Sequence, residues 1–217
     1  TTKICSIGLS KDDALIQLVE LDSDGLAHSE KLHLFIEECL GKVSIRASDL
    51  NAISVSKGPG SYTGLRIGIS AAKGLCYGLN IPLIAVDTLT AMANSVVHNV
   101  EKGAVLIPMI DARRIEVFCS IHHKGKEIKT VHSRVLDEEP FDELHSENVY
   151  YFGDGAEKAQ DYLNSSWIYL PEPKTSAKNL IPLAWRKFIN KDFEDVAYFE
   201  PSYHKDFLAG KPKKILK

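Results

Sequence analysis

A glycine-rich turn between a short apolar run and a helical segment is the stretch best suited to chemistry. Residues 57–68 read Lys-Gly-Pro-Gly-Ser-Tyr-Thr-Gly-Leu-Arg-Ile-Gly. The backbone amides of such a turn at a helix N-terminus can bind an anion such as phosphate. The turn lacks the Lys-Ser/Thr pair of a P-loop, and its glycines do not follow the GxGxxG spacing. A tight structural turn is therefore the favoured interpretation. The alternative is weak nucleotide binding by Gly58, Gly60, Ser61, Gly64 and Gly68.

The histidines and the turn serine are not spaced for metal binding or covalent catalysis. His28 and His33 are five residues apart, which places them about 140° apart on a helix. His122 and His123 are neighbours in an expected strand and point to opposite faces. Ser61 does not lie in a GxSxG motif and is better placed to cap a helix. The sequence therefore predicts no metal site, no cofactor and no catalytic residue.

Two aspartate positions and a basic segment each allow a functional and a structural interpretation. Asp111 followed by Arg113, and Asp154 between two glycines, could each supply a carboxylate to a site. Aspartates also bond to nearby backbone amides in turns, and that interpretation is favoured at both positions. The basic segment 211–217 is interpreted as a solvated tail, with contact to nucleic-acid phosphates or to an acidic protein surface as the alternative.

The composition is that of an ordinary globular protein with no general affinity for polyanions. Of the 217 residues, 44% are hydrophobic and 25% are charged, with a net charge of −3. No apolar run approaches the roughly 20 residues that span a bilayer, and no secretory pattern opens the sequence. The cysteines are widely spaced and form no CxxC pair; they are Cys5, Cys39, Cys76 and Cys119. We therefore expect a cytoplasmic protein with reduced, buried thiols and no membrane contact.

The helical segment 62–79 is expected to pack on at least two sides. It carries four glycines, each of which costs about 1 kcal/mol relative to alanine, so they are expected to serve geometry. One stripe holds small residues, namely Gly64, Gly68, Ala71, Leu75 and Gly78. Another stripe is apolar and holds Leu65, Ile69, Ala72 and Cys76. The small stripe lets another backbone approach closely, and the partner of the second is either the chain's own sheet or another chain.

The order of predicted elements is repeated along the chain. The first half contains strands at 4–10, 14–21, 52–56 and 83–86 and helices at 31–40, 62–79 and 88–99. The second half contains strands at 104–110, 115–122, 127–135, 149–152 and 167–169 and helices at 141–144, 156–164 and 176–190. It has one more strand at its front, so the first half lacks a leading strand. We expect two α/β domains with mixed sheets, residues 1–102 and 103–217, the second with a basic tail.

Several segments resemble the TsaB (YeaZ) family, within the superfamily of actin, sugar kinases and heat-shock chaperone ATPases. The matching segments are residues 58–68, Ile84-Ala-Val-Asp-Thr-Leu-Thr90 and Ile110-Asp-Ala-Arg-Arg-Ile-Glu-Val-Phe118, with shorter matches at 28–30 and 153–155. The resemblance implies an actin-like fold of duplicated ββαβαβα units. The family usually opens with a strand ending in Asp-Thr-Ser/Thr, of which only Thr1-Thr2 corresponds. Its Pro-x-Tyr-Leu-Arg sequence matches only in part at Pro201-Ser-Tyr203.

The resemblance implies a supporting subunit and not a free-standing enzyme. Members pair with a catalytic TsaD-like paralogue, and a TsaE-like ATPase joins them to install threonylcarbamoyl on the tRNA adenosine 3′ of the anticodon. The catalytic paralogue carries an HxxxH pair, which this sequence lacks. The first two helices form the subunit contact in the family, which implies an interface of Leu32, Phe35, Ile36, Leu65, Ile69, Ala72 and Cys76. Alone, the chain is expected to pair with itself through this face, and to meet tRNA only within the complex. The alternative is an independent glycoprotease-like peptidase or small-molecule kinase.

Overall fold

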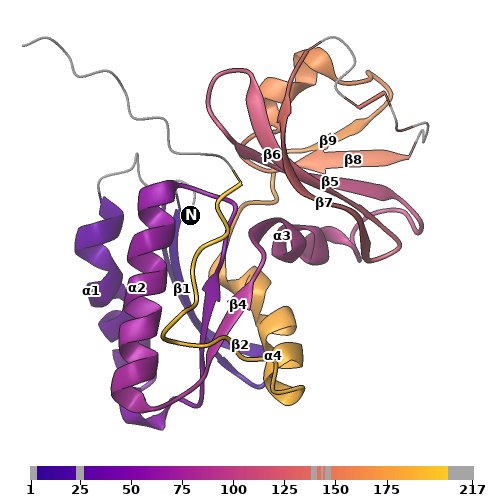
Figure 1. Cartoon of the computed structure of the whole chain (residues 1–217). Coiled ribbons are helices and arrows are strands. Elements are labelled where there is room, and N and C mark those ends of the chain that lie inside the picture. Colours follow the sequence, from indigo (N-terminus) through magenta and orange to yellow (C-terminus); the bar gives the residue numbers. More distant parts are fainter. Residues whose placement is uncertain (1–3, 23–26, 138–140, 143, 145–147, 205–217) are drawn as a thin grey trace, which may run out of the picture.

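The computed structural model describes residues 4–22, 27–137, 141–142, 144 and 148–204 (Figure 1). The helices and strands fall into two groups, one formed by the first half of the chain together with its last helix and one formed by the rest of the second half. In chain order they are β1 (Ile4–Lys11), β2 (Ala14–Asp22), α1 (Ala27–Gly41), η1 (Ala47–Asp49), β3 (Ile53–Ser56), α2 (Tyr62–Leu79), β4 (Leu83–Val86), α3 (Thr88–Val96), β5 (Val105–Asp111), β6 (Glu116–His123), β7 (Lys126–Val135), β8 (Val149–Phe152), η2 (Glu157–Tyr162), β9 (Ile168–Leu170), η3 (Ala177–Leu180) and α4 (Ile181–Ile189), where η marks a 3-10 helix.

The second half forms a five-stranded mixed sheet in the order β7-β6-β5-β8-β9. Its central strand β5 runs antiparallel to β6 and parallel to β8. Because alternate residues of a strand point to opposite faces, β5 contributes to two cores. Val105, Ile107 and Met109 pack with Trp167 on one face, while Leu106 and Ile110 join the core that α3 covers on the other.

The first half forms two separate strand pairs. β1 and β2 are an antiparallel hairpin, whereas β3 and β4 pair in parallel. α1 and α2 lie side by side on one side of these strands, and α4 lies on the other (Figure 1). A cavity of about 840 Å³, the β1–β3 cavity, is lined by residues of β1, β3 and these helices. The mixed-sheet α/β fold predicted from the sequence is confirmed, and a central strand joining the two pairs is lacking among the described residues.

The C-terminal part of the described chain returns to the first half. Leu180, Leu183 and Phe188 pack against the core of Ile84, Val86 and Ala91. Further along, residue 194 bridges to Leu83, and the amide of Ser202 donates to the carbonyl of Lys57. A domain boundary near residue 102 stays a prediction, but residues 177–204 make these contacts with the first half.

Some expected elements differ from the observed ones. The segment predicted as a helix at 156–164 is the 3-10 helix η2, and the helix predicted at 176–190 divides into η3 and α4. Pro182 lies in the first turn of α4, where its missing N–H costs least. Of the helix predicted at 141–144, the described residues form a turn. Thr1-Thr2, the side chains of 28–30 and the basic tail lie outside the described residues.

Two expectations about composition can be compared with the structure directly. All four cysteines are buried, as predicted, and all four are free thiols. Within the described ranges, no helix is both long and apolar enough to cross a membrane.

Candidate subunit interface

The glycine-rich turn is held by bonds within the chain. The carbonyl of Lys57 accepts from Ser202 N at 2.8 Å, and the carbonyl of Gly58 accepts from Thr88 N at 2.9 Å. Gly58 has a φ of +115°, and a Cβ there would lie 2.9 Å from the Ser202 carbonyl oxygen. Only glycine fits this approach without strain. The bonds support the interpretation as a structural turn.

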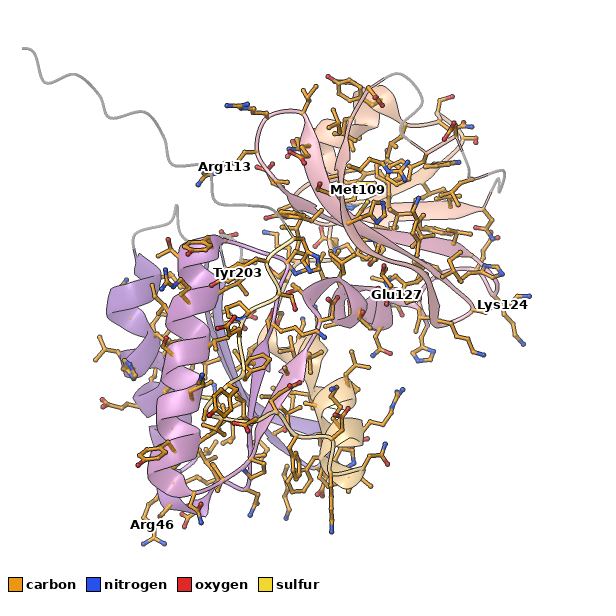
Figure 2. All side chains as sticks on the ribbon, in the orientation of Figure 1. Arg46, Met109, Arg113, Lys124, Glu127 and Tyr203 are labelled. Carbon is orange, nitrogen blue, oxygen red and sulfur yellow. The ribbon has the colours of Figure 1, made fainter. Side chains whose placement is uncertain are left out.

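Ser61 caps α2, as the sequence predicted. Its Oγ accepts from the amide of Gly64 at 3.3 Å. The side chain of Tyr62 follows at the start of the helix and packs against Tyr203, with ring centroids 5.0 Å apart (Figure 2). Gly60, Gly64 and Gly68 are half-buried. The segment around Tyr203 therefore lies next to the N-terminal end of α2.

A second helix cap, which the sequence analysis did not assign, lies beside the turn. Oδ1 of Asp87 accepts from Thr90 N at 2.9 Å and caps α3. Burial raises the pKa of this carboxyl, while Lys57 and His204 nearby oppose the shift. The His204 Nε2 is buried, and no hydrogen-bond partner for it lies in the described chain. Glu127 of β7 is a further ionisable residue on the side of the second-half sheet that faces Asp87 (Figure 2). Burial raises the pKa of its carboxyl. The pattern Asp-Thr-Leu-Thr after a buried strand could have revealed this cap.

The first candidate carboxylate, Asp111, is engaged at the turn between β5 and β6. Oδ1 of Asp111 accepts from Arg113 N at 2.8 Å and also pairs with the ammonium of Lys158. The same ammonium donates to the carbonyls of Arg114 and Glu116, at 2.9 and 2.6 Å. These bonds tie η2 to the turn and support the structural interpretation.

The apolar stripe of α2 lies in the chain's own core, which corrects the assignment of its residues to a subunit contact. Leu65 and Ile69 are only 2% and 3% exposed, and Ala72 and Cys76 are also buried. Ala72 and Cys76 pack with Leu83 of β4 and with Ile53 and Val55 of β3, half-buried in the same cluster. The physical reason is that the strand pair needs a helix over its apolar face, and this stripe of α2 supplies it.

Each of the three α1 residues assigned to the interface has a partly buried side chain. Leu32, Phe35 and Ile36 are half-buried. Leu32 and Ile36 line the β1–β3 cavity. Leu32 and Ile36 therefore lie between α1 and the strands.

The outer face of α2 is open. A shallow hollow of about 570 Å³ lies along it and reaches α1; it is lined by His33, Arg66, Ile67, Ser70, Ala71, Gly74 and Leu75. A Cβ added at Gly74, which lines this hollow, would meet no atom within 4 Å, and the same holds for the exposed Gly78 and for Gly68, which lines the β1–β3 cavity. The packing of the described chain therefore does not require glycine at these three positions. We call this surface the outer α1–α2 face.

In the described part of the chain, no three His, Cys, Asp or Glu side chains are grouped as ligands for a metal ion. Arg66 is the charged residue among those that line the hollow. Arg66 donates to the Tyr62 hydroxyl at 3.0 Å and lies over its ring. This face can therefore offer shape, apolar contact and one fixed cation.

Comparison with known proteins identifies relatives over nearly the whole chain. The chain is 28% identical over 221 residues to the tRNA threonylcarbamoyladenosine biosynthesis protein TsaB of Escherichia coli, covering 97% of this chain and 94% of that protein. The TsaB of Haemophilus influenzae is 26% identical, with 97% and 93% covered. The tRNA N6-adenosine threonylcarbamoyltransferase of Paracoccus denitrificans is 45% identical over 67 residues, which cover 31% of this chain and 19% of that protein.

Solved structures confirm the fold. YeaZ from Pseudomonas aeruginosa superposes with a TM-score of 0.77 at 22% identity, covering 93% of this chain and 95% of that one. The sequence-based resemblance to the TsaB (YeaZ) proteins is thus confirmed. The family model "TsaD: tRNA N6-adenosine threonylcarbamoyltransferase" matches residues 25–214. The chain therefore belongs to the TsaD family, and its near-full-length relatives there are TsaB proteins.

Proposed function

We propose that this chain is a supporting subunit in tRNA threonylcarbamoyladenosine biosynthesis and that its outer α1–α2 face docks on a TsaD-like catalytic subunit. The names of the near-full-length relatives support the process. The open glycines of α2 are the observation that supports the docking surface. In this proposal the partner supplies the catalytic residues, and a TsaE-like ATPase and tRNA join the assembly in the cytoplasm.

The glycines of α2 support docking because they weaken the helix without serving its own packing. Each costs about 1 kcal/mol relative to alanine. Gly74 and Gly78 are exposed and meet no atom where a methyl group would stand, and Gly74 lines the hollow. Where a helix carries glycine, the axis of a partner helix can lie closer than the usual 8–10 Å. A ridge of the partner's side chains then fits into the groove on the glycine-bearing helix. A partner ridge that fills the hollow beside Gly74 would recover this cost by burying apolar surface.

The composition of the outer face also indicates what the partner offers. Ile67, Ala71 and Leu75 supply apolar contact, while Arg66 stands at the rim. The matching surface on the partner is an apolar helix ridge with a carboxylate opposite Arg66, since a buried guanidinium needs a charged partner. When the catalytic subunit is missing, a second copy of this chain covers the same face as an isologous dimer.

The experiment that tests the proposal is a reconstitution with a docking variant. Purified chain, a TsaD-like subunit, a TsaE-like ATPase, threonylcarbamoyl-adenylate and tRNA are combined, and modified adenosine is measured. Gly74→Arg places a long, charged side chain in the hollow without entering the core. Ser165→Arg adds the same side chain at an exposed position in the second half.

The expected result is that product forms only when the chain is present, that Gly74→Arg lowers product at least tenfold, and that Ser165→Arg does not. Sedimentation is expected to show that Gly74→Arg also loses self-association. Product formation that is unchanged when the chain is omitted would contradict the supporting role. ATP turnover or peptide cleavage by the chain alone would favour the independent enzyme.

A further inference from the structure

The most exposed large apolar side chains of the described residues lie on three neighbouring segments. They are Tyr77 of α2, which is 86% exposed, Tyr198, which is 84% exposed, and Leu34 of α1, which is 60% exposed. Tyr77 and Leu34 belong to the two helices of the outer α1–α2 face. Tyr198 belongs to residues 194–204, which follow α4 and which we call the strap. Exposed aromatic and apolar side chains that gather on one surface are typical of a contact with another protein.

We propose that the strap is a third ridge of the docking surface, beside α1 and α2, and that a TsaD-like subunit binds across it with Tyr198 and Tyr77 as anchors. The inference rests on the proposed function for the identity of this partner. It adds to the two helices an element from the C-terminal part of the chain, and it assigns to Lys73 the role of holding that element in place.

The strap runs along α2 and is bound to it at two points (Figure 1). Nζ of Lys73 donates to the carbonyls of Ala197 and Phe199, at 3.0 Å each. The ring of Tyr203 packs on the ring of Tyr62 at the first turn of the helix. Lys73 follows Tyr62 by about three turns, or about 16 Å along the helix axis. The strap therefore borders most of the length of the outer face.

The backbone that carries Tyr198 is held in a defined turn. On either side of this residue, Val196 and Phe199 are half-buried in the core beneath α2. The amides of Ala197 and Tyr198 both donate to Oδ1 of Asp195, at 2.8 and 3.2 Å. A tyrosine side chain has only two rotatable bonds to order. Binding through this ring therefore loses little conformational entropy.

Tyr77 stands between the strap and the hollow. Successive residues of a helix are about 100° apart around its axis. Starting at the buried Cys76, one meets Lys73, then Tyr77 and then Ser70, which lines the hollow, within about 120°. The strap therefore lies at the border between the core and the hollow, and a partner seated in the hollow has Tyr77 and the strap at its edge.

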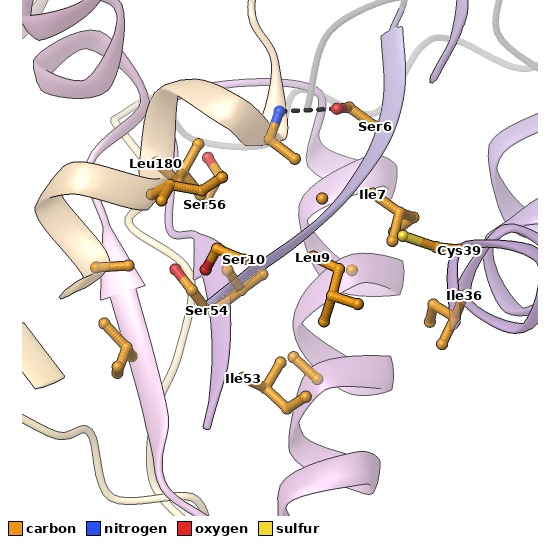
Figure 3. Close-up of a pocket in the computed structure, with 18 of the residues that line it drawn as sticks. Ser6, Ile7, Leu9, Ser10, Ile36, Cys39, Ile53, Ser54, Ser56 and Leu180 are labelled. Carbon is orange, nitrogen blue, oxygen red and sulfur yellow. Dashed lines mark hydrogen bonds between the residues drawn. The ribbon is translucent and has the colours of Figure 1, made fainter. Parts of the chain in front are cut away.

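The inner side of α2 is not part of this surface. Figure 3 shows Leu9 of β1 and Ile53 of β3 beside the helix, on the side where it borders the β1–β3 cavity. On its other side α2 lies next to α1. A partner that lies over Gly74 can therefore widen its contact in two directions, over α1 toward Leu34 or over the strap toward Tyr198.

The area of the contact favours a partner that reaches the strap. A stable interface buries about 800 Å² and roughly 20–30 residues on each side. The hollow is lined by seven residues and so forms only the centre of such a contact. A tyrosine buries about 150–250 Å², so Tyr77 and Tyr198 together would supply about half of the area. On the α1 side, Leu34 stands beside the exposed carboxylates of Glu37 and Glu38, which a partner would have to pair.

The test measures the affinity of the intact chain for a TsaD-like subunit by calorimetry. Tyr198→Ala removes one anchor at an exposed position, so the thermal midpoint should stay unchanged. We expect at least tenfold weaker binding. The control is Ile128→Ala, which shortens a side chain of β7 that is 58% exposed, and it should bind like the unaltered chain.

A second variant tests the role of Lys73. Lys73→Met keeps the length of the side chain but removes the donor that both strap carbonyls share. The amide of Phe199, which donates to the carbonyl of Asp195 at 2.8 Å, should then exchange at least tenfold faster. Binding should weaken as well. The double variant with Tyr198→Ala should lose no more affinity than Tyr198→Ala alone, because both changes act through the same ring.

The outcomes separate this inference from the proposed function. Unchanged binding by Tyr198→Ala, with binding lost in Gly74→Arg, would overturn the third ridge and leave the outer α1–α2 face as the docking surface. Binding that both variants retain, or that the unaltered chain lacks, would contradict the proposed docking itself and the inference with it. Weaker self-association of Tyr198→Ala with unchanged binding to the subunit would identify a second copy as the occupant. Additive losses in the double variant would refute the role of Lys73.

Discussion

Replacing Leu65 by alanine separates the core role of the inner α2 stripe from a role in docking. Leu65 is 2% exposed, and its two methyl carbons lie 3.3 and 3.8 Å from the position of a Cβ at Gly58. The substitution removes buried methyl groups beneath a turn that the Ser202 amide and the Thr88 amide hold in place. That region has little freedom to collapse, so we expect a loss of about 3 kcal/mol in the free energy of unfolding.

For a chain of this length, such a loss lowers the thermal midpoint by about 6–12 °C. Circular dichroism during heating and in urea measures it. The matched variant is Gly74→Ala on the outer face, where an added methyl group meets no atom. It should raise stability by about 1 kcal/mol, because alanine favours the helix. If Leu65→Ala unfolded like the unaltered chain but lost affinity for a TsaD-like subunit, the core assignment would be refuted.

Three further outcomes are expected. Lys158→Met should lower the free energy of unfolding by about 1–2 kcal/mol in urea titrations, because two carbonyls lose a charged donor. Burial lowers the pKa of His122 to about 4. The neutral ring therefore stabilises the fold above pH 6.5, and this stability falls by up to about 1.4 kcal/mol per unit as pH drops from 6.5 to 4. Unfolding of His122→Phe across that range should show a correspondingly smaller slope. Asp87→Ala should cost about 1 kcal/mol in thermal unfolding while Asp87→Asn costs little, because asparagine retains the cap on Thr90 N.

The sequence predicted the α/β fold because its elements are strongly periodic. The segment 62–79 coincides with α2, since Ser61 marks its start and its faces are distinct. Elements without such signals were less well predicted. The segment 156–164 lacks a regular apolar face and forms only the 3-10 helix η2. Pro182 disfavours helical geometry at the residue before it, which indicates the division between η3 and α4.

The candidate site was predicted less well because helical periodicity does not say what covers each face. The stripe of Leu65, Ile69, Ala72 and Cys76 could have met either a sheet or a subunit, and the structure places it in the chain's own core. The stripe of small residues carries Leu75 as its only large apolar side chain, so its pattern does not mark it as a contact. That Gly68 and Gly78 of this stripe, and Gly74 outside it, face open space follows only from the coordinates. The sequence analysis did not assign Asp87, although the pattern Asp-Thr-Leu-Thr after a buried strand indicates a helix cap there.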